Sequence, residues 1–160
     1  MWFFMNTCYL LSLISFLMLV TGFIQNLFNF FILNANHLTF MILTSIVYLF
    51  TETLVIFFFV GTGVSVKEFS LEHKLPTDFY KASIGIKRKV YPPLLLNMLF
   101  LIILFVMVGA VDTGHIPIVF YRLFFVFCIY HFIKMKMIQN ECFKKNTENI
   151  LAMAGLVTSN

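Results

Sequence analysis

Four apolar runs determine what this chain can fold into. They cover residues 6–24, 38–62, 94–111 and 116–133. An α-helix crosses the roughly 30 Å hydrocarbon core of a bilayer in about 17–25 residues, so each run is long enough to span a membrane once. Only 11% of the residues are charged, against about 25% in soluble domains. The sequence therefore predicts an all-α integral membrane protein with four transmembrane helices in a single membrane domain, residues 1–160.

The distribution of basic residues predicts how these helices are oriented. The connection between the second and third runs, residues 63–93, and the tail, residues 134–160, together hold ten of the eleven Lys and Arg residues. The other two connections hold none. Because basic loops stay on the cytoplasmic side, both termini and the basic connection are predicted to lie inside. The same rule is consistent with a bacterial inner membrane or an organellar inner membrane.

The inner connection, residues 63–93, is predicted to be structured. Thr77 and Asp78 make a plausible N-cap for a short basic helix over residues 79–89. Pro92 and Pro93 are then expected to start the third helix, where a missing N–H costs nothing. Since this loop adjoins two membrane exits, we expect its basic residues to contact anionic lipid, and not nucleic acid.

The tail, residues 134–160, is predicted to continue the fourth helix as an amphipathic segment. It contains no proline, and no glycine precedes Gly155. An apolar stripe runs along it, which we expect to lie on the inner leaflet or on a partner protein: Ile138, Cys142, Phe143, Ile150, Leu151 and Met153.

Glu52 is the polar residue that most needs an explanation. It lies about 21 Å along the second helix, where an unpaired carboxylate costs several kcal/mol. His131 of the fourth helix lies at nearly the same depth and is the expected partner. Such a pair can act as a proton relay, an ion site or a cofactor ligand, or it can fix the helix register. Arg122 is predicted about 12 Å above Glu52, on the opposite face from His131, with its side chain extending to the outer headgroups.

A second candidate site lies at the outer ends of the helices. His37 and His115 stand at the entrances of the second and fourth helices, and Asp112 precedes His115 by three residues. Two imidazoles on different helices are the ligand set of a six-coordinate haem b, and two His with a carboxylate suit a metal ion. The sequence thus contains a possible cofactor site, although this spacing is not specific.

Function is less constrained than fold. Nucleotide-binding, zinc-protease and serine-hydrolase motifs are absent from the sequence, which favours a non-catalytic role. Aromatic side chains cover several sides of the helices, as in segments that pack against other membrane subunits. We therefore predict an accessory subunit of a larger membrane complex, with an energy-transducing complex as one candidate. The alternatives are a small redox protein using His37 with His115 or His131 with Glu52, and a proton or small-solute conduit built on Glu52.

Overall fold

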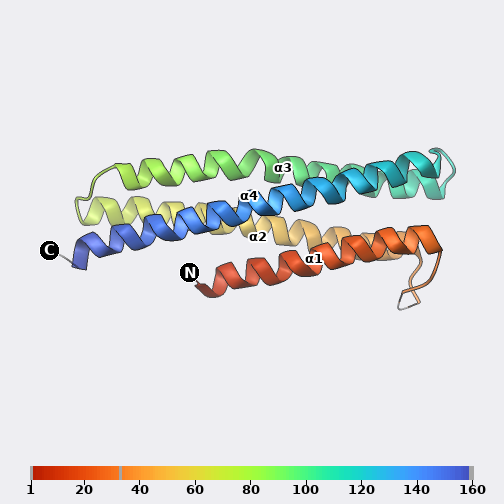
Figure 1. Ribbon diagram of the computed structural model, residues 1–160, viewed down its shortest axis with the longest axis horizontal. Helices are drawn as coiled ribbons and strands as arrows, with labels where there is room; N and C mark the ends of the chain where they lie inside the picture. The colour runs from red at the N-terminus through yellow and green to blue at the C-terminus, as the bar shows by residue number, and fades with distance from the viewer. Residues whose placement is uncertain (1, 33, 159–160) are drawn as a thin grey trace.

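Four long helices form an up-and-down bundle in the computed structural model, which describes residues 2–32 and 34–158 (Figure 1). All four are long and apolar enough to cross a membrane, which confirms the predicted fold class. Each helix packs on the next along the chain, and α4 also contacts α1. The helices are α1 (Trp2–Phe28), α2 (His37–Glu72), α3 (Asp78–Asp112) and α4 (Ile118–Thr158).

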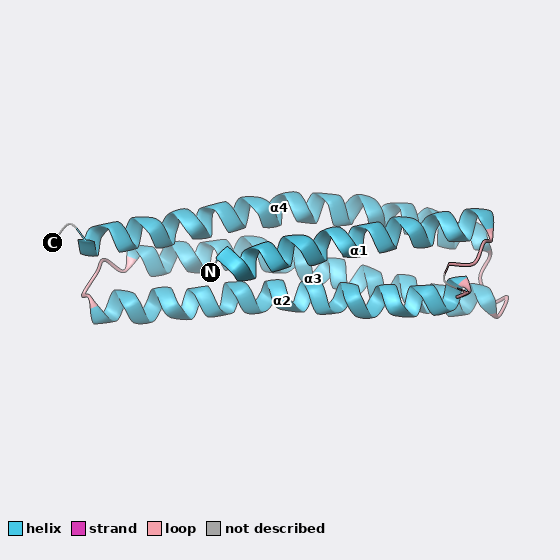
Figure 2. Ribbon diagram, turned by 90° about the horizontal axis from the view of Figure 1, so that it is seen from below, coloured by secondary structure: helices cyan, strands magenta, loops and turns pink. Residues whose placement is uncertain are grey.

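The two ends of the bundle carry different connections. One end holds the turn at residues 73–77 and lies toward both chain termini, and the other holds the connections at residues 29–36 and 113–117 (Figure 2). Asn29 and Asn34 adopt positive φ angles of 50° and 61° in the first of these connections, a conformation that asparagine tolerates better than most residues. The Asn36 side chain accepts from the Thr39 amide at 2.9 Å and caps α2.

The helices extend well beyond the predicted spans. Most of the predicted inner loop is helical, because α2 continues to Glu72 and α3 begins at Asp78. The short helix predicted over residues 79–89 is the first part of α3. The expectation that Pro92 and Pro93 start a helix is wrong, since both lie inside α3. They deprive the carbonyls of Arg88 and Lys89 of their helical donors, but both of those residues are exposed, where solvent or headgroups can replace the lost bonds.

Two apolar clusters occupy the bundle interior, one on each side of Glu52. Towards the connections at residues 29–36 and 113–117, ten buried side chains include Leu19, Tyr48, Leu104 and Phe125. Towards the 73–77 turn, a second cluster of ten includes Cys8, Val55, Phe59, Leu94 and Phe143. The polar residues described below lie between these clusters.

The tail is helical, as predicted, but its apolar stripe packs mainly within the chain. Cys142 and Phe143 are fully buried in the bundle, and the Phe143 ring stacks on Phe59 at a centroid distance of 5.1 Å. The expectation that this part of the stripe faces the inner leaflet or a partner is therefore wrong. The reason is that α1 and α2 extend alongside α4 far enough to cover it. Leu151, further along, is exposed.

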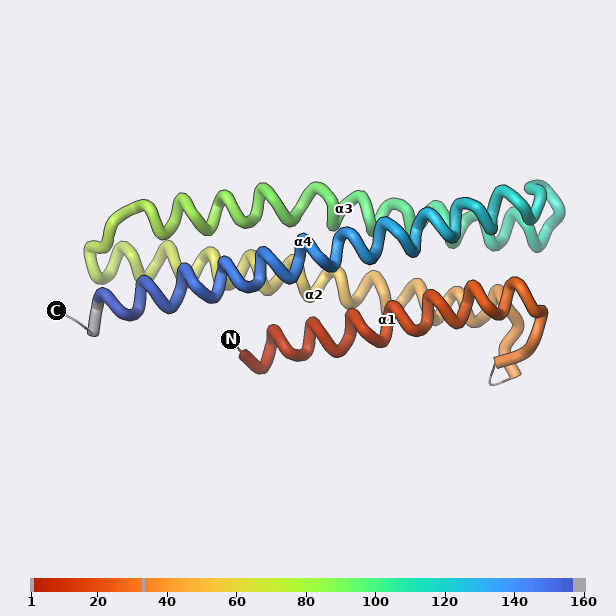
Figure 3. Tube along the Cα trace, viewed as in Figure 1, coloured from red at the N-terminus to blue at the C-terminus, as the bar shows by residue number. Residues whose placement is uncertain are grey.

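The helix α1 is shorter than the other three at the end that carries the 73–77 turn (Figure 3). Its first turn lies beside Phe58, on which Phe4 stacks with ring centroids 6.0 Å apart. Beyond that level α2, α3 and α4 continue without it, so the bundle has four helices over most of its length and three at this end.

Candidate functional site

The charge partner of Glu52 is Lys136. Glu52 is completely buried, and its Oε1 lies 2.9 Å from Lys136 Nζ. The Lys136 side chain is 17% exposed, and its ammonium also donates to Gln139 Oε1 at 2.9 Å. The same ammonium lies 5.0 Å from the centroid of the Phe132 ring. Lys136 therefore sits among groups that each stabilise a cation out of water.

Glu52 and His131 are brought together through a third residue, Asn97. The Asn97 amide donates from Nδ2 to Glu52 Oε1 at 3.3 Å, and its Oδ1 lies 3.1 Å from His131 Nδ1. Because a carbonyl oxygen only accepts, Nδ1 of His131 is the donor in this bond. The direct Glu52–His131 pair expected from the sequence is thus replaced by a bridge through Asn97. His131 also packs edge-on against Phe100, with ring centroids 4.9 Å apart.

Sequence reasoning missed both Asn97 and Lys136, for different reasons. Asn97 is the one strongly polar residue within the third apolar run, and this isolation could have marked it as a bundle-facing residue. Lys136 follows the fourth run and was counted as part of the inner tail. Because α4 continues as an uninterrupted helix and a lysine side chain is long, its ammonium can reach back to Glu52.

We name this connected group of side chains the polar layer: Glu52, Asn97, His131, Lys136 and Gln139. It combines a carboxylate, an ammonium, two amides and an imidazole, joined across α2, α3 and α4. A buried ion pair adds little net stability but strongly disfavours any helix register that separates its partners. Ser15 and Thr51 extend the layer to α1, with their hydroxyl oxygens 3.0 Å apart.

Arg122 lies near the end of the bundle that holds the connections at residues 29–36 and 113–117, and its guanidinium has a partner within the chain. It donates from Nε to the Asn26 side-chain oxygen at 2.9 Å and from Nη2 to the Asn26 carbonyl at 3.0 Å. Asn26 belongs to the last turn of α1, where backbone carbonyls lack helical donors and a cation is favoured. Arg122 thus ties the end of α1 to α4.

His37 and His115 do not share a site. His37 Nε2 lies 2.8 Å from the Tyr121 hydroxyl, and His37 and Asp112 line one cavity of about 360 Å³. His115 is exposed, and its Nδ1 bonds to the Thr113 hydroxyl at 2.8 Å. Within residues 2–32 and 34–158, no three His, Cys, Asp or Glu side chains are grouped to hold a metal ion. The structure therefore brings together His37 and Asp112, but not His37 and His115.

Two grooves open on the surface of the bundle. The first, which we name the seam groove, lies between α1 and α4, has a volume of about 540 Å³ and is lined by residues that include Tyr9, Ser12, Phe16, Phe132, Lys136 and Gln139. The second, the end groove, lies between α2 and α4 beyond the start of α1. Its volume is about 510 Å³, and its lining includes Phe58, Gly61, Ser65, Phe69, Ile150 and Met153.

Comparisons with family models, curated proteins and solved structures gave no significant match. The interpretation of the polar layer and the two grooves consequently rests on their geometry and chemistry.

Proposed function

We propose that the protein is a non-catalytic membrane subunit that assembles with another integral membrane protein through the end groove. The observation that carries this proposal is the apolar groove between α2 and α4, next to the level at which Phe4 stacks on Phe58. In the rest of the bundle α1 lies against both α2 and α4. Beyond the level of Phe4, no helix of the described residues covers the groove that α2 and α4 line.

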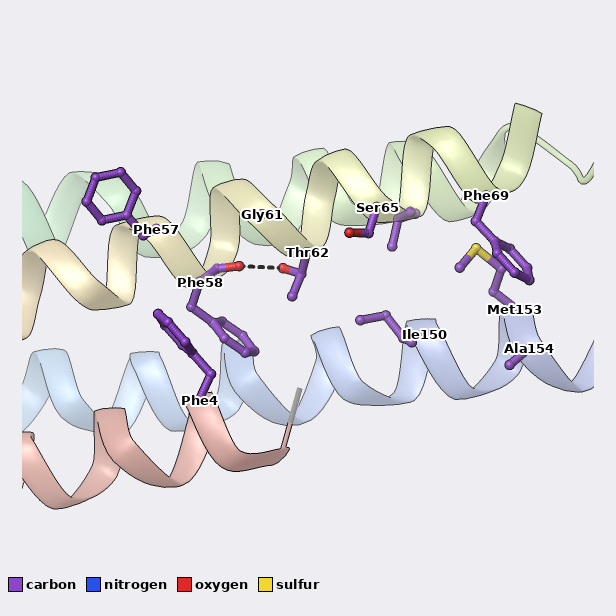
Figure 4. Close-up of a pocket in the computed structure, with 11 residues that line it drawn as sticks. Phe4, Phe57, Phe58, Gly61, Thr62, Ser65, Phe69, Ile150, Met153 and Ala154 are labelled. Carbon is purple, nitrogen blue, oxygen red and sulfur yellow. Dashed lines mark hydrogen bonds between the residues drawn. The ribbon is translucent and has the colours of Figure 1, made fainter. Parts of the chain in front are cut away.

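The lining of the end groove is suited to an apolar helix. From Phe58 to Phe69 the groove follows α2 for about 16 Å, the length of about three helical turns. Figure 4 shows the aromatic and aliphatic side chains that face into it from α2 and α4. The Thr62 hydroxyl donates to the Phe58 carbonyl at 2.9 Å, so its hydrogen is already used within α2. Few polar groups therefore need a partner there.

The occupant we propose is a helix of a partner protein that continues the line of α1. The end groove is continuous with the surface on which α1 itself packs, since Phe4 of α1 lines one end of it. A helix in this position would complete the four-helix arrangement and cover Phe69, Ile150 and Met153. Where the groove lies outside the hydrocarbon core, removal of this apolar surface from water drives the binding of the partner helix.

We assign the end groove to the inner membrane surface. The basic residues cluster at this end of the bundle, and Lys67, Lys81 and Arg88 are exposed there. The positive-inside rule places such residues on the cytoplasmic or matrix side, and we propose anionic lipid as their counter-ion. On this assignment, the partner is a protein with a helix at the inner membrane surface or in the part of the bilayer next to it.

A conduit built on Glu52 is less well supported by the geometry. The two apolar clusters flank the polar layer on both sides. Side chains such as Leu104 and Val90 are fully buried, and they separate Glu52 from the two ends of the bundle. A redox role at His37 and His115 has no shared site to support it.

Site-specific photo-crosslinking tests the proposal. A photoreactive residue at Ser65, in the groove, is expected to give one discrete protein adduct in native membranes. Gly61→Trp should abolish this adduct, because a side chain at Gly61 enters open space within the groove. The matched control is Gly85→Trp on α3, which also enters open space but lies outside the groove. Peptide mapping should locate the crosslink on an apolar helix of a different protein.

Three outcomes would overturn the proposal. The first is an adduct that persists unchanged in Gly61→Trp. The second is a crosslink to a second copy of this chain, which would make the groove a homodimer interface. The third is labelling of lipid alone, with no protein adduct, which would show that the groove opens to the bilayer.

A further inference from the structure

The seam groove combines polar side chains with apolar walls. Its α1 wall comes from the middle of a helix that has no charged residue. Its rim consists of exposed apolar side chains, among them Leu13 and Met137. Lys136 and Gln139 nevertheless line the same groove. Polar side chains in such a position normally have a partner, because an unsatisfied group in hydrocarbon costs several kcal/mol.

The two amide oxygens that line this groove already accept hydrogen bonds. Gln139 Oε1 accepts from Lys136, and Asn140 Oδ1 accepts from the Tyr9 hydroxyl at 2.6 Å. The Lys136 ammonium donates a second hydrogen bond to Glu52 Oε1. What remains is a set of donors, which are the third N–H of Lys136 and the amide NH₂ groups of Gln139 and Asn140.

Ser12 adds an independent observation at the same place. Its side chain lines the groove and is only 7% exposed. Its hydroxyl is buried without a hydrogen-bond partner among the described residues. A serine in a helix can usually bond to the carbonyl four residues earlier, as Thr44, Thr51 and Thr53 all do in α2. The Ser12 hydroxyl is therefore a further donor available to a ligand.

The charge of the groove indicates a neutral ligand. The Lys136 ammonium is balanced by the Glu52 carboxylate, so an anion would leave an uncompensated charge in a low-dielectric site. The groove volume of about 540 Å³ lies within the range of small-molecule sites, about 300–1,000 Å³. Phe16 and Phe132, whose ring centroids lie 5.7 Å apart in a stacked pair, add aromatic surface to the lining.

We propose that the seam groove binds a neutral, membrane-dissolved amphiphile whose head carries carbonyl oxygens. The carbonyl oxygens accept from Lys136, Gln139 and Ser12, while the apolar tail leaves the groove between Leu13 and Met137. Either the ring of a quinone or the ester group of a neutral lipid supplies this chemistry. The site is separate from the end groove, which lies between α2 and α4, so each proposal can fail without the other.

Equilibrium binding to the purified full-length chain tests this site. Three probes are compared by competition in detergent: decylubiquinone, a neutral diacylglycerol, and 1-phenyldecane, which has a ring and tail but no carbonyl. Saturable binding of decylubiquinone would identify a quinone ring as the ligand head, and preference for diacylglycerol would identify an ester group. Either probe should bind at least about 10-fold more tightly than 1-phenyldecane, as expected for two or more hydrogen bonds.

A matched pair of serine variants tests the contribution of Ser12. Ser12→Ala should weaken binding of the preferred probe by about 3–10-fold, the effect of one hydrogen bond. Ser70→Ala is the control, because Ser70 is equally buried at 7% exposure but lies outside the groove. It should leave the affinity unchanged.

Binding that does not distinguish carbonyl probes from 1-phenyldecane would overturn the proposal, since the groove would then be only an apolar surface. No saturable binding of either carbonyl probe to the wild-type chain would also overturn it. Tighter binding of the decanoate anion than of both neutral probes would also overturn the proposal. Equal affinities of Ser12→Ala and the wild type for the preferred probe would overturn it as well.

Discussion

The middle of the bundle and its three-helix end differ in how completely the chain covers its own surfaces. In the middle, where four helices meet, even a buried carboxylate has an ammonium and an amide as partners, supplied by Lys136 and Asn97. At the end beyond α1, apolar side chains line an open groove between α2 and α4. The chain thus supplies a charge partner for its buried carboxylate, although Glu52 Oε2 has no hydrogen-bond partner among the described residues. At the three-helix end it leaves an apolar surface open. On this contrast we base the proposal that a partner helix docks at the three-helix end.

Removing the ammonium from the polar layer should have the largest effect on stability. Lys136→Met leaves Glu52 buried without its charge partner, which typically costs about 3–5 kcal/mol. The double variant Glu52→Leu with Lys136→Met should recover most of this loss, because it removes both charges together. Unfolding in detergent, followed as a double-mutant cycle, measures the coupling. A coupling energy within about 0.5 kcal/mol of zero would show that the pair is not formed.

Removing the bridge should cost less than removing the ammonium. Asn97→Leu leaves polar atoms of Glu52 and His131 without the bonds that Asn97 supplies, a loss of about 1–3 kcal/mol. His131→Leu should be milder than Lys136→Met, since His131 reaches Glu52 only through Asn97. The same unfolding assay ranks the three variants. A loss for His131→Leu that equals the loss for Lys136→Met would favour the direct Glu52–His131 pair instead.

Two glycines near the three-helix end provide a sharper contrast. A Cβ at Gly63 would overlap the end of the Lys87 side chain and lie 3.0 Å from Ser83 Oγ, whereas a Cβ at Gly61 meets nothing within 4 Å. Gly63→Val should therefore displace the flexible end of Lys87 and shift Ser83 slightly, and destabilise the chain by about 1 kcal/mol relative to Gly61→Val, the low end of the overpacking range. The difference between the two unfolding free energies is the measurement. Equal stabilities would mean that Lys87 and Ser83 make room for the added side chain at no cost.

The exposed ion pair between α3 and α4 should matter least. Lys89 Nζ lies 2.6 Å from Glu141 Oε2, and both side chains are nearly half exposed. Surface pairs of this kind contribute little and are screened by salt. Lys89→Ala should leave the unfolding midpoint close to that of the wild type, with any difference disappearing at high salt. A loss comparable to that of Lys136→Met would show that burial does not explain the difference between the two pairs.

The sequence predicts the fold class well because it depends on local properties. Run length, charge depletion and the lysine-rich connection are sufficient to predict four membrane-spanning helices. The bounds of α2 and α3 were less predictable, because packing against neighbouring helices keeps Pro92 and Pro93 inside α3. In the same way, α1 and α2 cover Phe143, which the sequence alone assigns to the inner leaflet or a partner.

The candidate site was only partly predictable for a similar reason. The depth of Glu52 follows from counting residues along one helix, and it correctly marks the polar layer. Its partners depend on which faces of α3 and α4 turn inward and on how far a long side chain reaches. Counting along the sequence brings His131 to the right depth, but only the packed helices show that Asn97 lies between them and that Lys136 supplies the charge. The open end groove likewise appears only when the start of α1 is placed beside Phe58.

The migration of the complex on a native gel tests the account most directly. Membranes are solubilised in a mild detergent, and the wild-type chain is compared with Gly61→Trp and Gly85→Trp. The wild type and Gly85→Trp are expected to migrate in an assembly larger than the single chain, and Gly61→Trp is expected to migrate alone while keeping the wild-type unfolding midpoint. A wild-type chain that migrates alone, or an assembly that Gly61→Trp leaves intact, would contradict the assignment of the end groove as the docking site.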